Sequence, residues 1–71
     1  MKITYDREVD ALYIRFKVAT VTTEHVTDGI AFDYDAEGKL AGIEILDASE
    51  TLGDPGALTE VVVEELSPRS T

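Results

Sequence analysis

The sequence predicts a mainly β domain of the α+β class, an antiparallel β-meander of about five to six short strands with one short helix after the fifth strand. Short stretches alternate between apolar and polar residues, which is the period of a half-buried strand. Turn-forming Asp and Gly residues separate these stretches. The chain has only 71 residues, which is enough for one small domain.

The first three strands are expected within residues 2–5, 11–17 and 20–26. In the second of these, Leu12, Ile14 and Phe16 share one face. The third is rich in β-branched residues, which favour strands. Asp10 directly precedes the second strand, where its side chain can accept bonds from backbone amides in an Asx-turn.

Residues 30–34 and 40–46 are expected to form a hairpin around a type I turn at residues 35–38. With a bulge at Gly38, Asp35 faces Lys39 and Phe32 lies opposite Gly42. This register gives two apolar faces, with Phe32, Tyr34, Leu40 and Leu46 on one and Ala31, Ile43 and Ile45 on the other. Such a hairpin needs cover on both faces, from the C-terminal segment or from another subunit.

The C-terminal third is expected to contain one short helix and a segment whose secondary structure the sequence does not decide. Asp47 is a candidate helix cap, with Glu50 placed three residues on as in a capping box, and Gly53 is a candidate stop. Residues 59–66 fit a strand or a helix, and their three valines favour a strand. We therefore expect one domain over residues 1–66 and a flexible tail over residues 67–71.

Composition removes several classes of function. The chain has no cysteine, which excludes disulfides and thiolate metal sites. Its net charge is −9, and residues 18–71 hold twelve acids against two bases. This charge repels nucleic acid and attracts a basic protein or a cation. No apolar run has the roughly 20 residues of a membrane span, and the first residues do not form a signal peptide, so we expect a cytoplasmic protein without a membrane partner.

One stretch matches the spacing of a calcium-binding EF-hand loop. Asp33, Asp35, Glu37 and Gly38 are followed after five residues by Glu44. That loop requires flanking helices, whereas these flanks alternate like strands and place Glu44 roughly 20 Å beyond Gly38. We therefore expect an acidic hairpin, with Asp33, Asp35 and Glu37 as weak metal candidates only.

The other ionisable residues give weaker indications of a catalytic or metal-binding site. Asp33 and Asp35 share a strand face, yet a catalytic dyad needs a cleft for which this small domain has little room. Asp6, Glu8 and Asp10 alternate and form at most a weak cation site, and His25 is the only histidine. Ser49 has no partnering base in sequence and fits a helix start. We expect no catalytic residue and no cofactor.

Two motifs resemble a known family. Tyr5-Asp6, Asp10-Ala11-Leu12-Tyr13-Ile14, and the longer pattern from Asp28-Gly29-Ile30 to Asp47-Ala48-Ser49 are similar to the DUF2283 family of small uncharacterised prokaryotic proteins. The resemblance covers residues 1–52. It implies a compact β-rich fold and assigns no catalytic residue. Some relatives have been proposed as antitoxin-like partners of small toxins.

Three hypotheses of function follow. The first is a non-enzymatic protein-interaction module that self-associates, most simply as a dimer, because the core is small and the hairpin is apolar on both faces. The second is an antitoxin-like acidic partner that neutralises a small basic toxin, supported by the charge and the family analogy. The third is a weak metal-binding or small-ligand-binding protein that uses the acidic positions.

Overall fold

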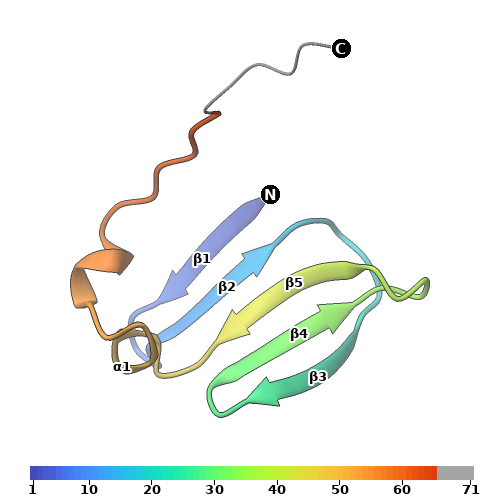
Figure 1. The fold of residues 1–71 in the computed structure, drawn as a ribbon, viewed down its shortest axis with the longest axis horizontal. Coiled ribbons are helices and arrows are strands. Elements are labelled where there is room, and N and C mark those ends of the chain that lie inside the picture. Colours follow the sequence, from blue (N-terminus) through green and yellow to red (C-terminus); the bar gives the residue numbers. More distant parts are fainter. Residues whose placement is uncertain (66–71) are drawn as a thin grey trace.

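The computed structural model describes residues 1–65 and folds them into one five-stranded antiparallel sheet followed by two short helices (Figure 1). The predicted fold class is confirmed, with one short α-helix after the fifth strand. The predicted tail at residues 67–71 lies outside the described residues. The elements are β1 (Lys2–Asp6), β2 (Ala11–Arg15), β3 (Thr22–Thr27), β4 (Ile30–Tyr34), β5 (Leu40–Ile45), α1 (Ala48–Leu52) and the 3-10 helix η1 (Pro55–Leu58).

The strand order in the sheet is β1-β2-β5-β4-β3, and every neighbouring pair is antiparallel. β3, β4 and β5 are joined in sequence as two hairpins, and β1 and β2 form a third hairpin. β5 is the central strand, because it pairs with β2 on one side and β4 on the other. β1 and β3 are the edges of the sheet (Figure 1).

The turn between β4 and β5 forms as predicted, but the register beyond it differs. Asp35 faces Lys39, whose carbonyl oxygen accepts a bond from the Asp35 N–H at 2.8 Å, and Gly38 has a φ of 80°. Tyr34 then pairs with Leu40, but Asp33 pairs with Gly42, so Ala41 is an extra residue in β5. This second bulge moves Phe32 from Gly42 to Ile43, and the predicted pairing of Phe32 with Gly42 is wrong.

The shifted register gathers the large apolar side chains on one face of the sheet. Directly paired residues share a face, so Phe32 lies with Ile43 and Ile30 lies with Ile45. Ala31 is paired instead with Glu44 on the opposite face. The prediction of a hairpin with large apolar residues on both faces is therefore wrong, because one extra residue reverses the direction of every later side chain.

Helix α1 begins without the predicted capping box. Asp47 has a left-handed backbone with φ 47° and makes no side-chain capping bond. The cap comes from Asp10, whose carbonyl oxygen accepts from the Ala48 N–H at 2.8 Å and whose carboxylate accepts from the Ser49 N–H at 3.2 Å. The predicted local Asx-turn at Asp10 is also wrong. An Asx-turn forms instead at Asp6, whose carboxylate accepts from the Glu8 N–H at 3.0 Å.

The chain after α1 forms no further strand within the described residues. Gly53 ends the helix as predicted, with a left-handed φ of 72°. η1 follows, and residues 60–65 are neither strand nor helix. Within residues 1–65 no large side chain is fully buried, and the buried residues are Ala31, Asp33, Ala41, Gly42 and Ala48. The domain is thus a single sheet with a thin core.

Candidate interaction surface

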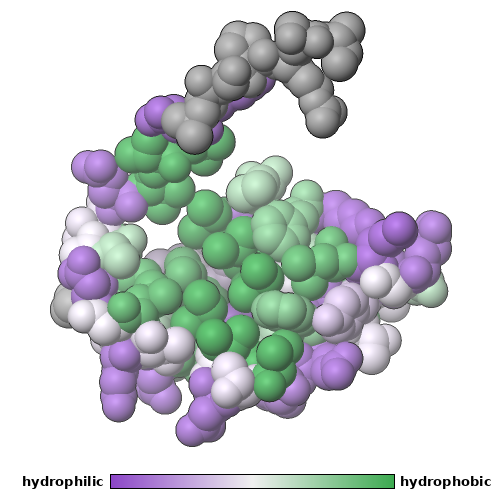
Figure 2. Space-filling view, viewed as in Figure 1, coloured by the Kyte–Doolittle hydropathy of each residue, from purple (hydrophilic) through white to green (hydrophobic). Residues whose placement is uncertain are grey.

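One face of the sheet, named here the apolar face, carries ten large apolar or aromatic side chains from four strands. Figure 2 shows hydrophobic side chains gathered across the middle of the sheet. The register places these residues on the same side: Ile3, Tyr5, Leu12, Ile14, Ile30, Phe32, Tyr34, Leu40, Ile43 and Ile45. Along the strands, the one charged residue that shares this side is Glu24, which pairs with Phe32 at the β3 edge.

The charged residues of the strands lie mainly on the opposite face. The alternation along each strand and the pairing between strands place five charged residues there: Lys2, Asp6, Arg15, Asp33 and Glu44. This separation follows from the strand period of two, which sends successive side chains to opposite sides. The two faces therefore differ sharply in polarity.

Within residues 1–65, no second layer covers the β4–β5 half of the apolar face. Helices α1 and η1 lie at one end of the sheet, beside the turn between β1 and β2 (Figure 1). Ile3 and Leu40 keep 39% and 37% of their surface exposed, and Phe32 and Ile43 are only half-buried. A sheet normally buries such a face against another layer.

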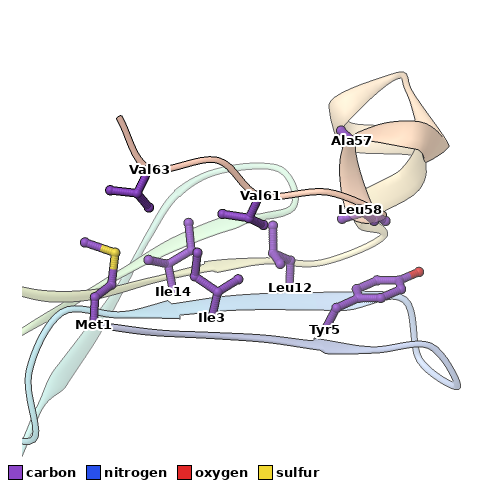
Figure 3. Close-up of a pocket in the computed structure, with 9 residues that line it drawn as sticks. All are labelled: Met1, Ile3, Tyr5, Leu12, Ile14, Ala57, Leu58, Val61 and Val63. Atoms are coloured by element: carbon purple, nitrogen blue, oxygen red, sulfur yellow. The ribbon is translucent and has the colours of Figure 1, made fainter. Parts of the chain in front are cut away.

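The C-terminal segment runs beside the β1 edge of the sheet, next to the β1–β2 half of the apolar face (Figure 1). A groove of about 630 Å³ separates the two. One side of the groove is lined by Met1, which precedes β1, and by the sheet residues Ile3, Tyr5, Leu12 and Ile14. The other side is lined by residues of the C-terminal part, Ala57, Leu58, Val61 and Val63. Figure 3 shows the side chains of Leu58, Val61 and Val63 directed toward the sheet residues.

The opposite face is organised around Asp33, which is only 5% exposed. Its carboxylate accepts bonds from the Tyr13 hydroxyl at 2.7 Å and the Thr23 hydroxyl at 2.5 Å. The bond to Asp33 raises the pKa of Tyr13, because it favours the protonated phenol. The Tyr13 ring also covers Gly42, where an added Cβ would lie 2.5 Å from the Tyr13 hydroxyl oxygen.

The residues that match the EF-hand spacing lie on the β4–β5 hairpin and not between two helices. Asp33 is engaged by two hydroxyl groups, and Asp35 forms an ion pair with Lys17. Asp35 also accepts from the N–H groups of Glu37 and Lys39 at 2.9 and 2.8 Å, which stabilises the turn. The bonds from Lys17 and from the Lys39 amide lower the pKa of Asp35. Among residues 1–65, no three His, Asp or Glu side chains are placed to hold one metal ion.

The remaining predicted residues separate into one cluster and one exposed position. Asp10 joins Tyr5 and Ser49, because its carboxylate accepts from the Tyr5 hydroxyl at 2.5 Å and from the Ser49 hydroxyl at 2.6 Å. Hydrogen bonds from Ser49 and, to a smaller extent, from Tyr5 lower the pKa of Asp10. The same bond to Asp10 raises the pKa of Tyr5. His25 is exposed on the edge strand β3.

The sequence did not reveal the apolar face as one surface, although its signals were present. The alternation in residues 12–16 and 30–34 was visible, but joining them requires the β2–β5 pairing and the bulge at Ala41. The Tyr13–Asp33–Thr23 cluster was also missed. Its residues come from three strands, and no shared pattern in the sequence links them.

No helix within residues 1–65 has the length and apolar character needed to cross a membrane.

Comparison with known proteins gives one match. A family model described as a protein of unknown function (DUF2283) matches residues 2–49, which include all five strands and the start of α1. No curated protein and no solved structure matches the chain. The matched region holds Tyr5, Asp10 and Ser49 but ends before the C-terminal side of the groove.

Proposed function

This chain belongs to the DUF2283 family of proteins of unknown function, and we propose that it acts as a non-enzymatic protein-interaction module whose apolar face packs on the same face of a second copy. The observation that carries the proposal is the apolar face itself. It gathers large side chains from four strands, and none of the described residues forms a second layer over β4 and β5. Packing two such sheets face to face buries both.

A second copy is the occupant because the domain has only a thin core of its own. Within residues 1–65 the buried apolar residues are three alanines. Domains of this size gain little from their own core, and a partner subunit is one of the few remaining sources of burial. A two-fold axis brings identical patches together, so a flat apolar face is complementary to itself.

The position of the charges permits this contact despite a net charge of −9 on each copy. Charged strand residues such as Lys2, Arg15 and Glu44 lie on the opposite face. Only Glu24, at the β3 edge, would approach the partner from the same side as Phe32. Packing therefore desolvates few charges, which matters because burial of an unpaired charge is costly.

The oligomeric state tests the proposal directly. Sedimentation equilibrium of the full chain should show a dimer at high micromolar concentration. Leu40→Lys places a charge on the apolar face and should raise the dissociation constant roughly tenfold or more. Val18→Lys adds the same charge at a residue that is 84% exposed and outside the sheet, so it is the matched control.

A strictly monomeric wild-type protein at high micromolar concentration would remove the homodimer. Equal weakening by Leu40→Lys and Val18→Lys would show that added charge, and not the apolar face, governs association. Circular dichroism of both variants checks that the sheet remains folded.

A second candidate is an acidic partner of a small basic protein, the antitoxin-like role. The observation in its favour is that the described residues contain one ion pair, Lys17 with Asp35, so most of the acids lack a cationic partner within residues 1–65. A partner of this kind should co-purify in equal amount and leave at high salt, because screening weakens attraction between exposed charges. Retention that is unchanged by salt would count against this role.

A further inference from the structure

We propose that residues 59–65, named here the strap, form a tethered cover that closes on the β1–β2 half of the apolar face and competes there with the second copy. This inference rests on the proposed function and adds its regulation. The strap begins where η1 ends and runs beside the β1 edge of the sheet (Figure 1), and its Val61 and Val63 line the groove opposite the sheet (Figure 3).

The strap has the side-chain pattern of a covering strand. Val61 and Val63 line the groove and Val62 does not, which is the alternation of an extended segment. Figure 3 shows the Val61 and Val63 side chains directed toward the sheet. Leu58, at the end of η1, is half-buried and also lines the groove, so the strap starts from a residue already seated there.

Within residues 1–65, hydrogen bonds hold the first residue of the strap, but not the residues that follow. The Thr59 N–H and hydroxyl both donate to the Gly56 carbonyl oxygen, at 3.2 and 2.8 Å. Residues 60–65 make no backbone hydrogen bond with other described residues. Val61 and Val63 remain 58% and 85% exposed, so the structure shows the strap near its site with the groove still open. Few bonds oppose its movement toward or away from the sheet.

Charge also favours this half of the face. Residues 1–17 carry four bases and three acids, whereas the rest of the chain is strongly acidic. The strap carries Glu60, Glu64 and Glu65. The β1–β2 hairpin, residues 2–15, holds three bases and three acids, so it repels an acidic segment less than the rest of the chain does.

Closure would reduce the surface that a second copy can use. β1 and β2 are two of the five strands, and they contribute Ile3, Tyr5, Leu12 and Ile14 to the apolar face. A stable interface buries about 800 Å² on each partner, a large demand for a chain of this size. Because the strap and the second copy require the same side chains, binding of one excludes the other.

The first measurement is a cross-link at concentrations where the chain is monomeric. The chain has no cysteine, so two introduced thiols report on a single contact. Ile3→Cys with Val61→Cys should form an intramolecular disulfide under mild oxidation. Ile3→Cys with Val62→Cys is the matched control and should react much more slowly. Equal rates for the two pairs, or cross-links only between chains, would overturn the strap.

The second measurement is the dissociation constant of the dimer. Val61→Ser with Val63→Ser removes apolar groups that face the groove and should lower the constant roughly threefold or more, because the strap competes less well. Val62→Ser should leave it unchanged. Weaker association of the double variant would overturn the competition, since the valines would then belong to the dimer contact.

The two proposals can fail separately. A wild-type chain that is monomeric at all concentrations, with a rapid Ile3–Val61 cross-link, would overturn self-association and the competition while supporting closure of the strap. A dimer whose monomer shows no preferential cross-link would support self-association and overturn the strap.

Discussion

Asp10 connects three parts of the chain through one side chain. It accepts from Tyr5 on β1 and from the backbone and hydroxyl of Ser49 on α1. Asp10→Asn keeps a residue that tolerates the left-handed φ of 55° but removes the charge that strengthens these bonds. We expect the Tm to fall by roughly 4–8 °C. Asp6→Asn, which affects only the bond from Glu8, should cost less in the same thermal melts.

Acid should remove the stabilisation that Asp10 and Asp35 supply. Hydrogen bonds lower the pKa of both carboxyl groups in the folded chain. Their contribution is therefore complete above the unfolded value of about 3.9 and is lost as the pH falls through the lower folded values. Thermal melts from neutral pH to about pH 2 should show this loss, and the difference between wild type and Asp10→Asn should shrink over the same acid range. A constant difference would contradict the assignment.

Thr23 and Thr22 are neighbours with opposite surroundings. The Thr23 hydroxyl donates to the buried Asp33 carboxylate, whereas Thr22 pairs with Tyr34 on the apolar face and makes no side-chain hydrogen bond within residues 1–65. Thr23→Val should lower the free energy of unfolding by about 1–2 kcal/mol, because a buried carboxylate oxygen loses its donor. Thr22→Val should change it by less than about 0.5 kcal/mol. Urea unfolding of the two variants gives the comparison, and equal costs would show that Asp33 does not depend on Thr23.

At the scale of the element, Gly42 lets β2 and β5 pair closely beneath the Tyr13 ring. A Cβ at Gly42 would lie 2.5 Å from the Tyr13 hydroxyl oxygen and 3.0 Å from the Ile14 carbonyl oxygen. Gly42→Ala should therefore cost about 1–3 kcal/mol of folding free energy through overpacking. In a Tyr13→Phe background the cost should be smaller, because the nearest atom is gone. A double-mutant cycle in urea measures this coupling, and a coupling of zero would contradict the contact.

The sequence predicted the strands and the helix better than the strand register and the contacts between elements. Alternation and β-branched residues together located all five strands, and glycine marked the end of α1 at Gly53. The bulge at Ala41 has no such marker, since alanine suits a regular strand position as well, and it reversed the faces of β5. The cap of α1 was hidden because Asp10 lies 39 residues before Ser49, beyond any local motif. Both errors concern tertiary pairing, which local patterns do not specify.

For the whole molecule, salt should affect the two proposed kinds of association in opposite directions. Two copies that each carry a charge of −9 repel, so added NaCl should strengthen the dimer by screening that repulsion. A complex with a basic protein should weaken under the same change. Sedimentation velocity at low and high NaCl measures the first effect. A dimer that dissociates as salt rises would show that its contact depends on ion pairs and not on the apolar face.

The central place of β5 also sets an order of events during synthesis. β3, β4 and β5 are neighbours in both chain and sheet, so they can form in microseconds through local closure. The β1–β2 hairpin is made first but pairs with β5 only after β3 and β4 have been added. Non-local pairing of this kind slows folding. On the ribosome, the first hairpin therefore waits with its apolar residues uncovered until the fifth strand emerges, and docking of β2 on β5 completes the sheet.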